Sequence, residues 1–255
     1  MLWYKSWLET RWRFLIGLAL LVVVACGNVF EYPQVLRLMP AAAAIDANGQ
    51  IGRAVKEAAE LSSEFRGHIW LQWFRQNLAQ LGTLLAALLG SGGLLAQSSG
   101  GAALFTLSLP VSRRQIVGVR AATGLAELLA LAVIPSLVIP LVAPAIGQSY
   151  SVGDAIVHAG CMFVGSAVFF SLAILLSTEY SDLWRPVMIT CFIAVVLSVT
   201  ELLVRDVAPY GIFRVMSAET YFRGGGLPWI GLLGSLAAAV AMLYTAGVNI
   251  AHRDF

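Results

Sequence analysis

The chain has little charge. Only 12% of its 255 residues are Asp, Glu, Lys or Arg, about half of the ~25% found in soluble domains. Hydrophobic residues make up 59%, against about 45–50% in soluble domains. This composition excludes a disordered chain and argues against a solvated enzyme domain of this length. The formal net charge of +2 is too close to balance to indicate a nucleic-acid-binding protein.

Cysteine and catalytic motifs are also scarce. The three cysteines, Cys26, Cys161 and Cys191, all lie in apolar blocks, and none belongs to a C-x-x-C pair. An odd number of cysteines gives no disulfide framework, so we interpret them as small buried residues. The sequence contains no H-E-x-x-H zinc motif, no G-x-S-x-G nucleophile motif and no G-x-x-x-x-G-K-[ST] nucleotide loop. We therefore expect no metal, no cofactor and no catalytic site on this chain.

Long apolar blocks dominate what remains. A membrane-spanning helix needs about 20 mostly apolar residues, and six blocks meet this requirement. They are Phe14–Phe30, Leu78–Ala96, Thr123–Ile146, Ala155–Ser177, Val187–Val204 and Leu227–Val248. The blocks lack the alternation of barrel strands, and only helices satisfy their own backbone in lipid. The sequence predicts one all-α integral membrane domain over residues 1–255.

The orientation follows from Lys and Arg beside the spans. With the N-terminus inside, basic residues are evenly divided between the two sides, but the inner segments are shorter. Gly147–Asp154, between the third and fourth spans, contains no Lys or Arg and fits an outer loop. We therefore expect a multi-pass protein with both termini in the cytoplasm, in the inner membrane of a prokaryote.

Two connecting segments carry helical patterns of their own. In residues 1–13, Trp3 and Trp7 recur at helical spacing among basic residues, which predicts an amphipathic helix in the inner membrane interface. The outer connection, residues 31–77, contains an amphipathic pattern that we expect to end at Gly67. Ile69–Phe74 then resembles an aromatic belt at the entrance of the second span.

The inner connection, residues 97–122, contains the strongest local signal. Ser112 and Gln115 match a capping box, so a helix is expected to begin at about Arg113. Arg113 and Arg114 occupy its first turn, where the helix dipole disfavours cations by about 0.3–1 kcal/mol each. Two explanations stay open: positive-inside topology with lipid phosphates, or an acidic protein partner.

Three ionisable residues lie within the predicted spans. Glu127 is near the inner end of the third span, His158 near the outer end of the fourth and Glu201 near the outer end of the fifth. Ionisable groups in membranes are costly and are candidates for a transport pathway. All three are also close enough to an interface to reach water.

The third span contains three prolines within ten residues, Pro135, Pro140 and Pro144. Because proline removes a backbone donor, we expect a hinge or a broken outer half. A static kink filled by a neighbouring helix is the alternative.

Phe105–Val117, with Pro110 before the capping box, resembles the inner loop of type-2 ABC transporter permeases, the membrane subunits of ATP-driven exporters. The layout is similar as well: an N-terminal interfacial helix, six spans and a short basic tail. The family often has an acid before the threonine of this run, whereas Gln97–Gly101 is neutral. The resemblance implies a coupling helix within about residues 105–120 and partial re-entry of Tyr210–Gly226 from the outer side. The residues expected to couple to the ATPase are Pro110, Ser112, Arg113, Arg114, Gln115 and Arg120.

The resemblance also implies the partners. It implies a separate ABC ATPase subunit that binds ATP and magnesium, and a second permease subunit, identical or different, all embedded in membrane lipid. The function expected is transport of a substrate that the sequence does not specify. Two rivals stay open: a proton-coupled secondary transporter using Glu127 or Glu201, and a membrane scaffold without transport.

Overall fold

The structure is a computed structural model that describes residues 2–43, 56, 58–91, 113–180, 182–204 and 211–252. Within these ranges the chain is helical and contains no strand. Five of the described helices are long and apolar enough to cross a membrane: Leu2–Leu38, Gln115–Ile146, Val152–Ser177, Trp184–Leu203 and Trp229–Ala251. This confirms the all-helical fold and is the make-up of an integral multi-pass membrane protein.

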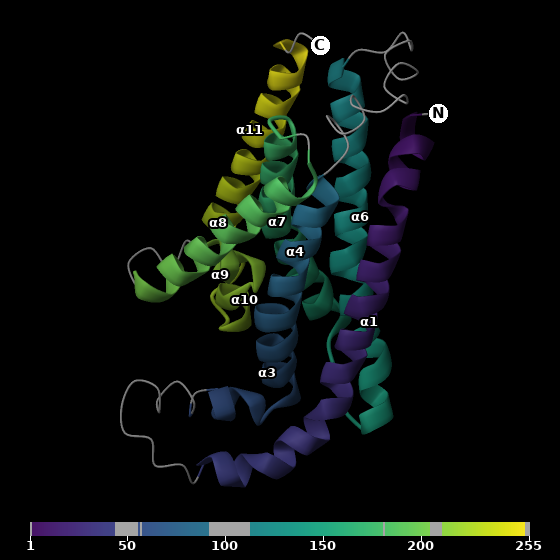
Figure 1. Ribbon diagram of the computed structural model, residues 1–255. Coiled ribbons are helices and arrows are strands. Elements are labelled where there is room, and N and C mark those ends of the chain that lie inside the picture. The colour runs from purple at the N-terminus through teal and green to yellow at the C-terminus, as the bar shows by residue number, and fades with distance from the viewer. Residues whose placement is uncertain are drawn as a thin grey trace.

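The helices follow one another in a simple order (Figure 1). The elements are α1 (Leu2–Ala43), α3 (Phe65–Ile69), the π-helix η1 (Trp70–Asn77), α4 (Leu78–Gly90), α6 (Arg113–Val142), the 3₁₀ turn η2 (Ala143–Ile146), α7 (Val152–Ser177), α8 (Trp184–Leu203), α9 (Ile212–Met216), α10 (Glu219–Phe222) and α11 (Trp229–His252). The boundaries of α7, α8 and α11 lie within four residues of the predicted spans. Arg113 and Arg114 are helical, as predicted, and are the first residues described after the 92–112 connection.

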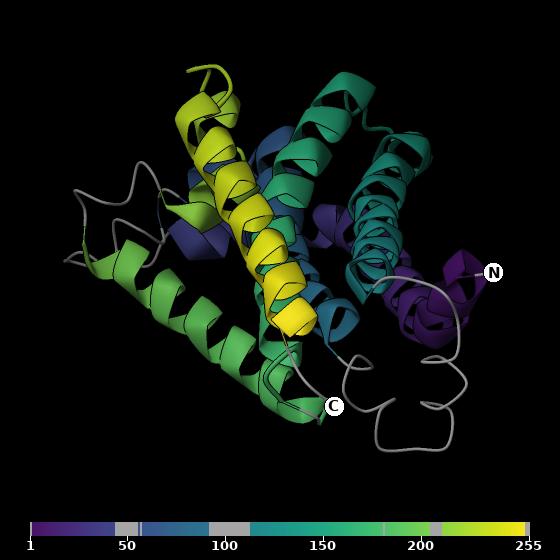
Figure 2. The same cartoon turned by 90° about the horizontal axis from the view of Figure 1, so that it is seen from above.

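Helix α7 forms the centre of the bundle. It packs against α4, α6 and α11, and 61% of its most apolar window is buried, compared with 22% for α8 and 17% for α11. Small residues bring the inner helices together, as is common in membranes. A Cβ atom on Gly90 would lie 2.5 Å from the carbonyl oxygen of Phe170. Seen from above, α8 lies at the rim (Figure 2).

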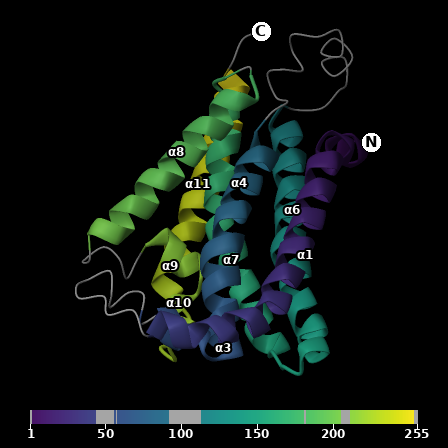
Figure 3. The ribbon, with the colours of Figure 1, turned by 60° about the horizontal axis from the view of Figure 1, so that its bottom comes forward.

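The two ends of the bundle differ in what they carry (Figures 1 and 3). The first residues of α1 and the last of α11 lie at one end, together with the end of α4 and the start of α6; we call this the termini end. The opposite end carries α3, the connection between α6 and α7, and the short helices α9 and α10; we call this the α9–α10 end.

The first helix is longer than predicted. Residues 2–43 form one helix, so the N-terminal segment is continuous with the first predicted span rather than a separate helix, and the helix runs on beyond Phe30. Figure 1 shows that the last part of α1 turns across the α9–α10 end. This part contains Pro33, and proline is a common cause of helix bending.

The second predicted span, 78–96, is helical over Leu78–Gly90, and residues 92–96 lie outside the described part of the chain. It is not among the five helices named above. Helix α3 and the π-helix η1 precede it without a break, so this helical stretch begins at Phe65. The amphipathic pattern upstream ends in a turn at Ser63 and Glu64, not at Gly67, which lies inside α3 against the carbonyl of Leu61.

The expected aromatic belt is an interior feature instead. Trp70, Trp73 and Phe74 are all fully buried. The Trp70 indole donates to the Ser217 carbonyl at 2.9 Å, and the Trp73 indole lies 3.4 Å from the Ser136 hydroxyl. Buried indoles need such partners, so these rings join helices rather than contact lipid.

The prolines of α6 do not break it. The helix continues through Pro135 and Pro140 to Val142, and Pro144 lies in the 3₁₀ turn that follows. The Ser136 hydroxyl donates to the Ala132 carbonyl at 2.7 Å, and side-chain hydroxyls of this kind help proline-containing helices to persist in membranes.

Candidate functional site

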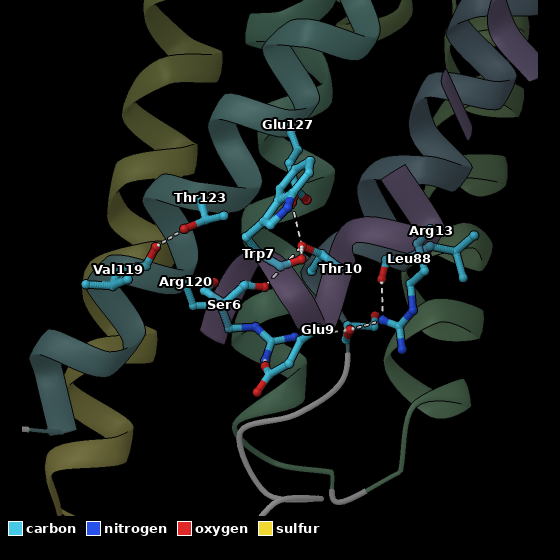
Figure 4. A network of polar contacts seen from close by, with 11 residues as sticks. Ser6, Trp7, Glu9, Thr10, Arg13, Leu88, Val119, Arg120, Thr123 and Glu127 are labelled. Carbon is cyan, nitrogen blue, oxygen red and sulfur yellow. Dashed lines mark hydrogen bonds and ion pairs between the residues drawn. The ribbon is translucent and has the colours of Figure 1, made fainter. Parts of the chain in front are cut away.

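A polar network lies at the termini end, where α1, α4 and α6 meet (Figure 4). Its first member is Arg13 of α1. One guanidinium nitrogen of Arg13 donates to the carbonyls of Leu88 and Ser91, at 3.2 and 3.0 Å. The last carbonyls of a helix have no partner within the helix and carry partial negative charge. Arg13 therefore caps the C-terminus of α4 from a neighbouring helix.

Arg120 of α6 reaches the same point from the other side. Its side chain is buried, donates to the Ser91 carbonyl at 3.4 Å, and pairs with Glu9 of α1 at 3.7 Å. A buried guanidinium requires such compensation, because an unpaired buried charge is very costly. Two arginines from two helices thus converge on Ser91, the last residue described before the 92–112 connection.

Glu127 lies deeper along α6. It is 3% exposed, and the hydroxyl of Thr10 on α1 donates to its Oε1 atom at 2.5 Å. The Thr10 hydroxyl also lies 3.2 Å from the Ser6 carbonyl of its own helix. Glu127 therefore joins α1 to α6 from inside the bundle.

Three buried polar atoms of this network have no hydrogen-bond partner in the described part of the chain. They are the Ser91 hydroxyl, Nε of Arg120 and Oε2 of Glu127. Each such group costs about 1–3 kcal/mol when it stays unpaired. Unpaired buried polar groups are rare in native structures, and each calls for a physical explanation.

Only part of this network could be predicted from the sequence. Pro110 and Ser112 lie outside the described residues, while Arg113 and Arg114 begin α6 and Gln115 is exposed. Arg120 was predicted to be one of the residues that couple to the ATPase, but its side chain points inward to α1 and α4. Sequence reasoning missed Thr10 and the capping role of Arg13. The signal was a hydroxyl, Thr10, and a cation, Arg13, three residues apart at the point where the polar start of α1 becomes apolar.

Glu201 belongs to a different place. It is partly buried at the end of α8, and its Oε1 accepts a hydrogen bond from the Phe213 backbone N–H at 3.1 Å. Phe213 is in the first turn of α9, where backbone donors need acceptors. The Glu201 carboxylate also packs against Gly211, the residue before α9. A Cβ atom at Gly211 would overlap this carboxylate. Glu201 thus acts as a cap for α9.

His158 lies at the α9–α10 end and is fully buried. Its ring stacks on Phe74 at a centroid distance of 4.5 Å and meets the edge of Tyr221 at 5.6 Å. Neither ring nitrogen makes a well-formed hydrogen bond with the described residues. The three candidate pathway residues therefore lie in three separate environments.

A groove of about 290 Å³ opens between α4 and α8. Its lining is mainly apolar, with the polar side chains of Gln80, Thr83 and Ser198 among it. Gln80 is exposed and lies half a turn from Gly82, which faces Ser166 in the middle of α7. An amide at this depth is costly in lipid, so the groove is suited to an amphipathic occupant.

Comparison with known proteins gives no match: no protein-family model, no curated protein and no solved structure matches the chain. Within the described residues, no group of three or more His, Cys, Asp or Glu could hold a metal ion. In the part of the chain that it describes, the structure thus defines a helical protein with five helices long and apolar enough to span a membrane. A buried polar network joins the first of them to α4 and α6.

Proposed function

We propose that the chain is the transmembrane permease subunit of an ATP-driven transporter of the type-2 ABC class, with six spans and both termini in the cytoplasm. A separate ATPase subunit would bind ATP and magnesium, and a second permease subunit would complete the pathway. The α3–η1–α4 stretch would supply the sixth span. This proposal rests on the resemblance of Phe105–Val117 to the coupling loop of that class.

One structural observation supports it more than any other. The connection over residues 92–112 leaves α4 at the point where Arg13 and Arg120 hold the last turn of that helix. A partner that pushes or pulls this connection would act on α4, α1 and α6 together, because all three meet at Ser91. Coupling needs such a contiguous set of contacts between the docking segment and the moving helices.

The groove between α4 and α8 gives the substrate a place to bind. We infer an amphipathic substrate, whose apolar part would contact Leu84 and Val195 and whose polar group would reach Gln80 or Ser198. Only 22% of the most apolar 18-residue stretch of α8 is buried against other helices. Helix α8 therefore has few contacts to break when it moves.

Glu127 favours a second candidate function, a proton-coupled secondary transporter. A buried carboxyl with one oxygen bonded to a hydroxyl and the other unpaired is a candidate proton site in a membrane. In that case the chain alone, reconstituted in vesicles, would move substrate along a proton gradient, and Glu127→Gln would abolish the flux. Proton-independent transport that requires an ATPase would favour the first proposal, and the absence of both would leave a scaffold.

The docking hypothesis is tested by reversing the charges of Arg113 and Arg114. The double variant Arg113→Glu/Arg114→Glu suits the N-terminal helix dipole better than wild type, so α6 should fold normally. Facing an acidic partner, it would place like charges together at a cost of several kcal/mol. We expect normal membrane insertion, loss of ATPase co-purification and loss of substrate-stimulated ATP hydrolysis.

The matched control is Lys5→Glu/Arg11→Glu, which reverses the same number of positive charges, but on α1. The Arg11 guanidinium lies 5.5 Å from the exposed Trp12 ring, in a position suited to lipid. This control should keep most of the ATPase binding. Wild-type ATPase binding and hydrolysis in the Arg113→Glu/Arg114→Glu protein would refute the docking assignment. Both arginines would then be explained by positive-inside topology and contacts with lipid phosphates.

A further inference from the structure

A clasp of side chains from three elements closes the α9–α10 end of the bundle. Asp154, in the first turn of α7, accepts from Nε of Arg66 on α3 at 3.1 Å and from the Tyr221 hydroxyl on α10 at 2.9 Å. The same guanidinium lies 5.3 Å from the ring of Phe222. One carboxylate therefore connects α7 with both α3 and α10.

Behind the clasp lies an imidazole with unsatisfied hydrogen-bonding groups. His158 is fully buried between Phe74 and Tyr221, and its two ring nitrogens make no well-formed hydrogen bond with described residues. The Ser217 carbonyl also lies within reach of the ring, and it already accepts from the Trp70 indole at 2.9 Å. An imidazole held this way carries no charge, because a buried unpaired cation is very costly.

Asp154 and His158 are separated by four residues on α7, the spacing at which helical side chains pair. An acid followed by a cation four residues later is also the favoured order of such a pair. In this structure Asp154 instead accepts from Arg66 through Oδ2 and from Tyr221 through Oδ1. Asp154 thus has three possible partners, Arg66, Tyr221 and His158, and a proton on His158 would shift the balance among them.

We propose that Asp154 and His158 form a proton-operated latch at the α9–α10 end. With His158 neutral, Asp154 holds Arg66 and Tyr221 and the end is closed. When His158 binds a proton, its imidazolium pairs with Asp154, and α3 and α10 are released. The protonated state belongs to the open form, so a fall in pH favours opening.

The other charged groups around the latch are compatible with this exchange. Glu219 is already shared by Arg214 and Arg223, at 3.4 and 3.0 Å, so it does not compete for Arg66. The Tyr150 hydroxyl is buried without a hydrogen-bond partner in the described residues, and burial raises its pKa. Its hydrogen bond to Asp154 raises the pKa of Tyr221, so both phenols stay neutral where imidazole titrates. Asp154, Arg66 and His158 therefore carry the response.

The test is hydrogen exchange of the full chain in lipid nanodiscs at about pH 7.5 and about pH 5.5, on either side of the ordinary imidazole pKa of about 6.5. Exchange times are scaled to correct for the intrinsic pH dependence of amide hydrogen exchange. Opening linked to one proton changes about tenfold per pH unit. We expect the α9–α10 peptides of the wild type to exchange at least about tenfold faster at the lower pH.

Variants separate the latch from a general effect of acid. His158→Phe keeps an aromatic ring on Phe74 and should remove the response, and His158→Gln serves the same purpose if the larger ring disturbs packing. Asp154→Asn should exchange fast at both pH values. His68→Gln is the matched control: His68 is also buried, and it contacts the Asn28 carbonyl at 3.1 Å rather than Asp154.

The control should keep the wild-type response. A wild type without a pH response would overturn the proposal, as would a full response in both His158 variants. A response lost in His68→Gln and kept in His158→Phe would also overturn it. The readout needs neither an ATPase nor a substrate, so its outcome is independent of the transport function proposed above.

Discussion

Replacing Arg13 by Met tests whether the termini end is held by the cap on α4. The change keeps the length and the apolar stem of the side chain and removes the donors that reach Leu88 and Ser91. A hydrogen bond from a charged group contributes about 1.5–3 kcal/mol in water-soluble proteins. Interhelical hydrogen bonds in membranes average only about 0.6 kcal/mol, with a maximum near 1.7. For two bonds from one partly exposed guanidinium, we expect a loss of about 1–3 kcal/mol.

Arg120 makes the prediction sharper, because it donates to the same Ser91 carbonyl. In a double-mutant cycle with Arg120→Met, the two losses should not add, since either arginine alone partly satisfies that oxygen. A coupling energy of about 0.5 kcal/mol or more is expected for residues that share a partner. Arg120→Met alone should cost more than Arg13→Met, because it also removes the ion pair of Arg120 with Glu9 at 3.7 Å.

The assay is reversible unfolding in mixed micelles, followed by far-UV circular dichroism. Arg11→Met is the control: the same substitution on the same helix, at an exposed residue over Trp12, should change stability by less than about 0.5 kcal/mol. A value for Arg13→Met as small as that of the control, or additive losses in the cycle, would refute the shared cap.

Four further variants test the two remaining polar contacts, that of Thr10 with Glu127 and that of Glu201 with α9. Thr10→Val removes the only hydrogen-bond donor to Glu127 in the described residues and should destabilise the chain by about 1–3 kcal/mol. Glu127→Gln keeps the acceptor and should stay near wild type by the same unfolding measurement; equal stability of Thr10→Val and wild type would contradict the contact. Glu201→Gln keeps an acceptor for the Phe213 N–H and should leave stability and transport nearly intact. Glu201→Leu should cost about 0.5–2 kcal/mol, as lost N-terminal caps do, and hydrogen exchange at α9 should rise; unchanged exchange there would remove the capping role.

Local signals in the sequence determined where several helices lie and where they end. The predicted fourth span ends at Ser177, as α7 does, and the residues from Arg113 into the third predicted span are helical, as expected. The physical reason is that a spanning helix requires about 20 apolar residues. The turns between spanning helices are enriched in Gly, Pro and short polar residues, which are visible in the sequence. These requirements act along the chain and can be read without knowing what each helix touches.

Only the tertiary structure decided which face of each helix meets protein. Trp70 and Trp73 have the composition of an interfacial belt, yet both are fully buried and bonded to other elements. Arg13 has the pattern of a lipid-facing cation, yet it caps α4, and Glu201 caps a helix that begins eleven residues later. In a membrane, lipid and protein interior are both apolar, so hydropathy does not distinguish a face covered by lipid from one covered by a helix. That choice depends on contacts between residues far apart in the chain, such as Thr10 with Glu127.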